Sequence, residues 1–109
     1  MMQASINELI VTDIAGNFAR LICENTNTFS VLESMGFSQE DKHFVRSIKD
    51  DADRLQLVLA LIDMNALFSS GRDWSPAELV ELYRDEGRVT KNFRIITWTA
   101  PGDFLITTR

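Results

Sequence analysis

The segment SQEDKHFVRSIKDDADRLQLVLALIDMNALF, residues 38–68, carries the strongest periodic pattern in the chain. Apolar residues recur in it at alternating spacings of three and four, which is the period of one face of an amphipathic helix. They are Val45, Ile48, Ala52, Leu55, Leu59, Ile62 and Ala66. Acidic residues follow Ser38 in the first turn, where the helix macrodipole favours them. The pattern predicts one long central helix over residues 38–68.

The continuity and burial of this helix are two points that the sequence leaves open. Eleven of the fourteen residues 55–68 are apolar and the segment before them is mostly polar, so only the second half is expected to be buried on nearly all sides. Asp50 or Asp51 could instead cap a fresh helix and place a bend there. Asp63 interrupts the apolar half. Because Asp is rarely buried, we expect it to mark a solvent-facing stripe rather than a buried, partnered carboxylate.

Capping patterns predict three further helices. The sequences SINE, SVLE and SPAE each match a capping box, in which the Ser hydroxyl and the Glu carboxylate satisfy free backbone N–H groups of the first turn. They begin helices over about residues 5–24, 30–35 and 75–86. In the first of these, apolar residues also recur at spacings of three and four. The third has Pro76 at its first helical position and Gly87 after its last, as the preferences for helix ends require.

The last sixteen residues, RIITWTAPGDFLITTR, predict two β-strands over about residues 92–99 and 104–108. Pro101-Gly102 suits a type II turn, whose twist fits a two-residue hairpin poorly, so we expect a loop of about four residues. The predicted fold is therefore α+β and mainly α. It has about four helices, one long and central, and a C-terminal antiparallel β-hairpin, in a single domain of residues 1–109.

The charge of the chain is unevenly spread. Residues 1–86 hold seven Lys and Arg against fifteen Asp and Glu, a net of −8, whereas residues 87–109 have a net of +3. The simplest interpretation is that an acidic helical layer faces a basic hairpin. A candidate acidic face on the helical part consists of Glu40, Asp41, Asp50, Asp51 and Asp53.

No set of residues in the sequence forms a recognisable catalytic or metal site. His43, the one histidine, follows Glu40 and Asp41, but no second pair of ligands completes a coordination shell. Cys23, the one cysteine, ends an apolar stretch and is expected to be a buried, inert thiol. The sequence contains no phosphate loop or nucleophile elbow. We therefore expect a non-enzymatic protein without a metal or cofactor.

The location of the chain is predicted to be cytoplasmic. A single cysteine excludes an intrachain disulfide, which fits a reducing compartment. The segment MMQASINELIV lacks the basic and apolar regions of a secretory signal. The most apolar stretch, residues 55–68, is too short to span a bilayer, so no contact with a membrane is expected.

The C-terminal hairpin is the candidate functional surface. It is apolar on both faces, so any register leaves large side chains outside the core. Its last strand has no proline, and no charge between Asp103 and Arg109, so its edge is poorly protected against addition of another strand. The candidate interface residues are Ile96, Trp98, Phe104, Leu105 and Ile106. We expect a protein-interaction module that forms a homodimer through this hairpin, an apolar helix face, or both.

Two other functions are weaker alternatives. A winged-helix DNA-binding regulator would also end in a basic hairpin, but the preceding segment SPAELVELYRDEG is acidic, and carboxylates facing phosphates cost affinity. A nucleic-acid partner is therefore not expected. The third hypothesis is a small inhibitor or immunity-type protein whose acidic face covers a basic site on a target.

Overall fold

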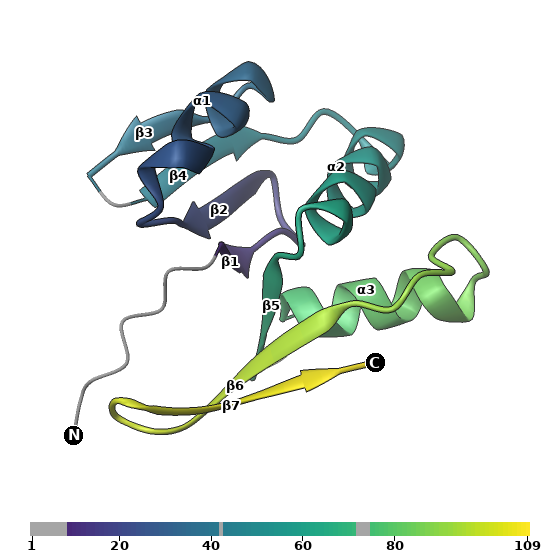
Figure 1. Ribbon diagram of the computed structural model, residues 1–109. Coiled ribbons are helices and arrows are strands. Elements are labelled where there is room, and N and C mark those ends of the chain that lie inside the picture. The colour runs from purple at the N-terminus through teal and green to yellow at the C-terminus, as the bar shows by residue number, and fades with distance from the viewer. Residues whose placement is uncertain (1–8, 42, 72–74) are drawn as a thin grey trace.

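A computed structural model describes residues 9–41, 43–71 and 75–109, and within them it contains three helices and a seven-stranded mixed sheet (Figure 1). The elements, in chain order, are β1 (Ile10–Asp13), β2 (Phe18–Ile22), α1 (Thr26–Ser34), β3 (Ser38–Glu40), β4 (His43–Ser47), α2 (Asp51–Asp63), β5 (Leu67–Ser70), α3 (Pro76–Asp85), β6 (Arg94–Ala100) and β7 (Asp103–Thr108). The prediction of a mainly α fold with four helices is therefore wrong, and the fold is α/β.

The strands are ordered β3-β4-β2-β1-β5-β6-β7 across the sheet. The central strands β1, β5 and β6 run parallel to one another. The other pairs, β3–β4, β4–β2, β2–β1 and β6–β7, are antiparallel. The C-terminal hairpin is thus one margin of the sheet rather than an appendage to a helical bundle.

The predicted central helix over residues 38–68 is divided among four elements. Residues 38–40 and 43–47 form β3 and β4, and β4 pairs with β2 along its whole length, from His43 opposite Ile22 to Ser47 opposite Phe18. The helix α2 begins only after Asp50, whose side chain accepts a hydrogen bond from Asp53 N (2.8 Å) and caps it. Only the alternative of a fresh helix near residue 50 is correct. In the first half, pairing with the distant strand β2 decides the structure, although the spacing of the apolar residues fits a helix.

The predicted first helix is also replaced by strands. Its described part forms β1 and β2, joined by a turn that contains Gly16, while residues 5–8 lie outside the described residues. The neighbouring β-branched residues Ile10, Val11 and Thr12 favour extended backbone. Spacings of three and four therefore arose here from two strands that fold back on each other.

The predictions near the remaining helices are closer to the structure. α1 begins earlier than expected because the side chain of Asn25 accepts a hydrogen bond from Asn27 N (3.0 Å), which leaves Ser30 inside the helix. α3 has the predicted capping box of Ser75 and Glu78. Gly87 follows α3 with a φ of +77°, a conformation that favours glycine after a helix.

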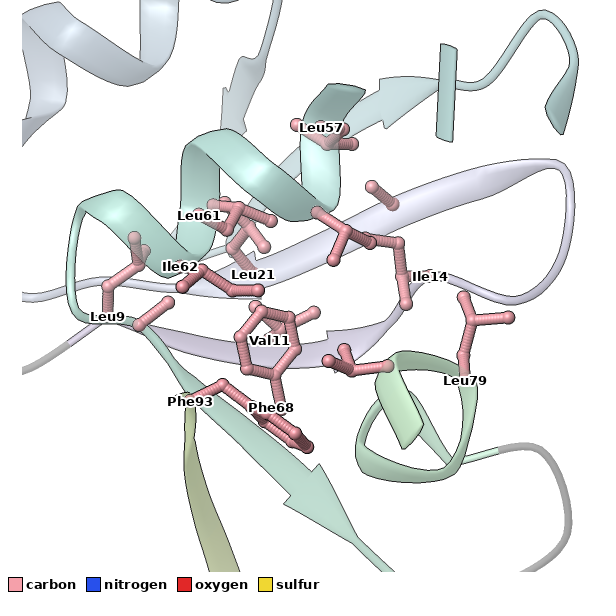
Figure 2. Packing of buried hydrophobic residues seen from close by; sticks show 14 of the residues in the cluster. Leu9, Val11, Ile14, Leu21, Leu57, Leu61, Ile62, Phe68, Leu79 and Phe93 are labelled. Carbon is pink, nitrogen blue, oxygen red and sulfur yellow. The ribbon is translucent and has the colours of Figure 1, made fainter. Parts of the chain in front are cut away.

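The main core lies between the three helices and one face of the sheet. Directly opposite residues form a row across five strands of this face, namely Phe44, Leu21, Val11, Phe68 and Ile95. All five belong to one buried cluster with residues of α1, α2 and α3. Figure 2 shows Leu57, Leu61 and Ile62 of α2 on the same side of the sheet as Val11 and Leu21, with Leu79 on α3 at the right.

The opposite sheet face carries a second, smaller apolar cluster. Its fully buried members are Ile10, Leu67 and Ile96, and the partly buried Ile22, Phe104 and Ile106 pack around them. All six come from strands, so none of the described helices contributes to this cluster. We call this side the helix-free face of the sheet.

Candidate protein-interaction surface

The strands of the hairpin have a fixed register. β6 and β7 are joined by the two residues Pro101-Gly102, and Ala100 is paired with Asp103. The expected four-residue loop is therefore not present. Gly102 has a φ of +83°, as a type II turn requires, and a bulge between Trp98 and Ala100 alters the local twist of β6. The two-residue connection is thus accompanied by an irregular pairing in β6 close to the turn.

Four of the five candidate interface residues share one side of the hairpin. Ile96 lies opposite Ile106 and Trp98 lies opposite Phe104, so all four point to the helix-free face. Leu105 lies opposite Thr97 and points to the other side of the sheet. The structure therefore divides the candidate set between two faces.

The distal half of the hairpin projects beyond the helices (Figure 1). Trp98 is 49% exposed and Leu105 is 56% exposed there, although both are large and apolar. The rings of Trp98 and Phe104 pack edge to face, with 5.6 Å between their centroids. The tip thus presents a preformed aromatic pair on one face and an exposed leucine on the other.

β7 is the edge strand on this side of the described sheet. Phe93 and Arg109 exchange two backbone hydrogen bonds of 2.9 Å, which sets the alternation of the ladder between β6 and β7. In an antiparallel ladder every second residue bonds to the same neighbour. The N–H and C=O groups of Phe104, Ile106 and Thr108 therefore point away from β6, toward the free edge.

The base of the hairpin is held against α3 by Arg84. Its Nη2 atom donates to the carbonyl oxygens of Lys91 (3.0 Å) and Arg109 (2.7 Å), and its guanidinium lies 4.8 Å from the centroid of the Phe93 ring. The side chain of Arg109 is in turn paired with Glu81 of α3. These contacts fix the end of β7 relative to the helical layer.

The acidic candidates at the start of α2 are paired within the molecule. Asp51 accepts a hydrogen bond from Tyr83 Oη (2.7 Å) and forms ion pairs with Arg88 (2.9 Å) and Arg54 (3.4 Å). These contacts, with the Tyr83 hydrogen bond the largest and Arg88 next, lower the pKa of Asp51 below its ordinary value. Its charge therefore serves the contact between α2 and α3.

Asp53 is likewise bound to other groups of the same chain. It accepts from the backbone N–H of Lys49 (3.0 Å) and from Arg46 Nη2 (2.7 Å), and these two hydrogen bonds, the first being the larger, lower its pKa. Arg46 lies on β4, so this pair ties α2 to the sheet. With Asp50 as the cap of α2, all three aspartates have structural roles.

The other two acidic candidates lie elsewhere. Glu40 ends β3, and Asp41 follows it in the turn to β4, with a φ of +63°. That turn precedes β4, whereas α2 follows β4, so the two acidic groups lie at opposite ends of this strand. The predicted acidic face is therefore not one continuous surface.

Asp63 lies on the exposed side of α2, as the solvent-facing interpretation predicts. Its side chain is 59% exposed and its Oδ1 atom lies 2.6 Å from Lys91 Nζ. An ion pair between two such exposed groups contributes little to stability.

Among the described residues, the candidate metal ligands and the cysteine do not come together into one site. Over the described ranges, no three His, Cys, Asp or Glu side chains come together as a metal-binding group. His43 lies opposite Glu40 in the β3–β4 ladder, and Cys23 is buried, with its thiol 3.6 Å from the Asn25 carbonyl oxygen. No helix in the same part of the chain is long and apolar enough to cross a membrane.

Comparison with known proteins found no match: no family model fits the chain, and neither a curated protein nor a solved structure is similar to it.

Sequence reasoning missed the part of the helix-free face that lies outside the hairpin. Ile10 and Ile22 pair directly across β1 and β2, and Ile10 also lies opposite Leu67 of β5. Phe18, at the start of β2, is 52% exposed. The only available signal was the β-branched character of residues 10–12, because the pairing of these strands is not local.

Proposed function

We propose that the chain is a cytoplasmic, non-enzymatic protein-interaction module that associates with a second copy of itself through its C-terminal hairpin. The observation that supports this most is the combination of the exposed Trp98, packed edge to face against the partly buried Phe104, with a free edge strand beside them. Exposed aromatic side chains next to buried apolar residues are typical of the few positions that dominate binding energy at protein interfaces. An unpaired strand edge supplies backbone hydrogen bonds to the same partner.

The apolar face of α2 offers less for association than the hairpin does. Leu57, Val58, Leu61 and Ile62 are all buried in the core. The exposed apolar residues of the helices, Val31 on α1 and Leu82 on α3, lie on different helices. The hairpin therefore carries the densest group of exposed large apolar side chains among the described residues.

The alternatives gain no support from the geometry. The hairpin lies within a seven-stranded sheet and α3 packs on that sheet with Leu79 and Val80, so the helix and wing arrangement of a DNA-binding regulator has no counterpart. The inhibitor hypothesis needs free carboxylates, whereas Asp51 and Asp53 are ion-paired within the chain.

The proposed function predicts that replacement of Trp98 weakens self-association. We expect wild-type protein to be a dimer at micromolar concentrations, and Trp98→Ser to raise the dissociation constant about tenfold or more, because it removes the largest exposed apolar side chain of the hairpin. Sedimentation equilibrium or light scattering over a dilution series measures this constant.

Phe18→Ser is the matched control for this variant. Phe18 is exposed to a similar extent, 52% against 49%, but it lies on β2, which is three strands away from β6 in the sheet. We expect this variant to leave the dissociation constant unchanged. A monomeric wild-type protein, or equal losses in the two variants, would contradict the proposed function.

A further inference from the structure

We propose that β7 of one protomer pairs antiparallel with β7 of a second copy, with Ile106 on the two-fold axis. This inference rests on the proposed self-association and specifies its geometry. It joins two seven-stranded sheets edge to edge into one continuous sheet, and its register follows from the backbone and the charges of β7.

The backbone groups of the free edge match this register. The outward-facing residues are Phe104, Ile106 and Thr108, which are symmetric about Ile106. Placing Ile106 opposite Ile106 of the second copy puts Phe104 opposite Thr108, and Thr108 opposite Phe104. Each opposite pair exchanges two hydrogen bonds, so about six form in all.

The charges at the two ends of the strand match the same register. It places Asp103 opposite Arg109 of the second copy, at both ends of the interface. These two residues form a pair without backbone hydrogen bonds between them, in which opposite side chains approach most closely. Asp103 forms no ion pair with any other described residue, whereas Arg109 is held in place by Glu81. The second copy therefore supplies an ion-pair partner for Asp103.

The apolar side chains also become covered. On the helix-free face, Ile106 meets Ile106 of the second copy, which extends the strip formed by Ile96 and Phe104. On the other face, Leu105 lies opposite Thr107 of the second copy, so an exposed leucine gains a neighbour. A shift of the register by two residues in either direction leaves one outward-facing residue of each strand unpaired and separates Asp103 from Arg109.

The opposite margin of the sheet is unsuited to the same pairing. β3 has only three residues, Ser38–Glu40, and all are exposed. It ends at Glu40, next to Asp41, so two acidic side chains lie near this edge among the described residues. Short edge strands with charged side chains resist strand addition. Of the two edge strands, β7 is therefore the one suited to pairing with a second copy.

Disulfide trapping tests the position of the two-fold axis in the full chain. In the proposed register, the Cα atoms of Ile106 and its copy lie about 5.5 Å apart, within the span of a disulfide. We expect Ile106→Cys to form a covalent dimer on mild oxidation. Thr108→Cys is the matched control, since its two copies lie roughly 13 Å apart along the strands and should not cross-link. The buried Cys23 is common to both variants.

A charge exchange tests the register without a new cysteine. Asp103→Arg and Arg109→Asp should each weaken dimerisation about tenfold or more, because each places like charges opposite one another. An equimolar mixture of the two variants should regain the dimer as a heterodimer, since both end pairs are then of opposite charge. Circular dichroism of each variant establishes that it is folded.

The outcomes separate this geometry from the proposed function. A wild-type monomer overturns both. A wild-type dimer in which Ile106→Cys cross-links no better than Thr108→Cys, or in which the mixed charge variants stay monomeric, overturns the β7 pairing alone and points to another contact. Cross-linking at Ile106 together with recovery in the mixture supports it.

Discussion

At the scale of single residues, Tyr83 is the side chain that joins α3 to the start of α2. Its hydroxyl donates to Asp51, and its ring lies under the guanidinium of Arg88, 4.9 Å from ring centroid to Cζ. Burial, and next the hydrogen bond to Asp51, raise the pKa of Tyr83 above its ordinary value. This hydrogen bond thus links Tyr83, whose ring is buried in the core, to Asp51 in the first turn of α2.

Titration of Tyr83 gives a direct test of this contact. Because its pKa is raised in the folded state, its contribution to stability is present below the unfolded pKa near 10 and is lost as the pH rises through the folded pKa. We expect Asp51→Asn to lower the pKa of Tyr83 while leaving it above the ordinary value, because burial remains. The chain has one tyrosine, so tyrosinate absorbance reports this group alone.

Asp63→Asn is the control for the titration. Asp63 lies at the other end of α2, where it pairs with Lys91 rather than with Tyr83. Its removal should leave the tyrosinate curve unchanged. The same curve for Asp51→Asn and wild type would show that the Asp51–Tyr83 hydrogen bond does not form.

At the scale of elements, one sequence pattern takes two different structures within the described residues. Ser-x-x-Glu begins α3 at Ser75, lies inside α1 at Ser30, and falls outside the described residues at Ser5. The capping function requires a Ser whose own backbone is extended, as it is at Ser75, where φ is −62° and ψ is 156°. The pattern becomes a cap only where the preceding chain is not helical.

The two described copies of this pattern should respond differently to mutation. Ser75→Ala removes an N-cap and should lower the free energy of unfolding by about 1 kcal/mol. Ser30→Ala, at an exposed position inside α1, should be neutral or raise it by about 0.5 kcal/mol, because Ala is the better helix former. Urea denaturation of both variants measures the difference, and equal effects would contradict these assignments.

At the scale of the whole molecule, the centre of the sheet is buried on both faces. Leu67 and Phe68 are neighbours on β5, belong to the two different apolar clusters, and are both fully buried. In a sheet with one solvated face, only one of two such neighbours would be buried. The helix-free face is therefore part of the folding core at β5, and it becomes exposed toward the hairpin tip on one side and at Phe18 of β2 on the other.

Alanine replacement along β5 tests this two-sided burial. We expect Leu67→Ala to cost about 2–5 kcal/mol and Phe68→Ala about 3–5 kcal/mol, from lost apolar transfer and the cavity that remains. Ser69→Ala, on the half-buried part of the strand, should stay within about 0.5 kcal/mol. Urea unfolding at one protein concentration measures all three, and a cost below about 1 kcal/mol for Leu67→Ala would show that the helix-free face is not core.

The candidate surface could be predicted from the sequence in part. The apolar residues on both sides of the hairpin and its unprotected last strand were visible locally, and both strands are present. Leu105 lies on the opposite face of the sheet from the other four candidates, and this could be seen only from the pairing of β6 with β7. The ion pairs of the acidic candidates could not be predicted, because Arg46 and Arg88, which pair with Asp53 and Asp51, come from other parts of the chain.

The sequence by itself determined the features that depend on neighbouring residues. These are the cap of α3 at Ser75, the presence of the terminal hairpin, and the start of α2 at Asp50, which the sequence offered as an alternative. Each depends on side-chain to backbone contacts or dihedral preferences within a few positions.

Only the tertiary structure decided that residues 10–22 and 38–47 are strands. Their apolar spacing fits a helix as well as it fits a folded pair of strands, and the difference lies in hydrogen bonds between β2 and β4, which join residues more than twenty positions apart. A strand satisfies its backbone groups only through such partners, whereas a helix satisfies its own. For the same reason, the outward backbone groups of β7 are the ones that we propose pair with a second copy.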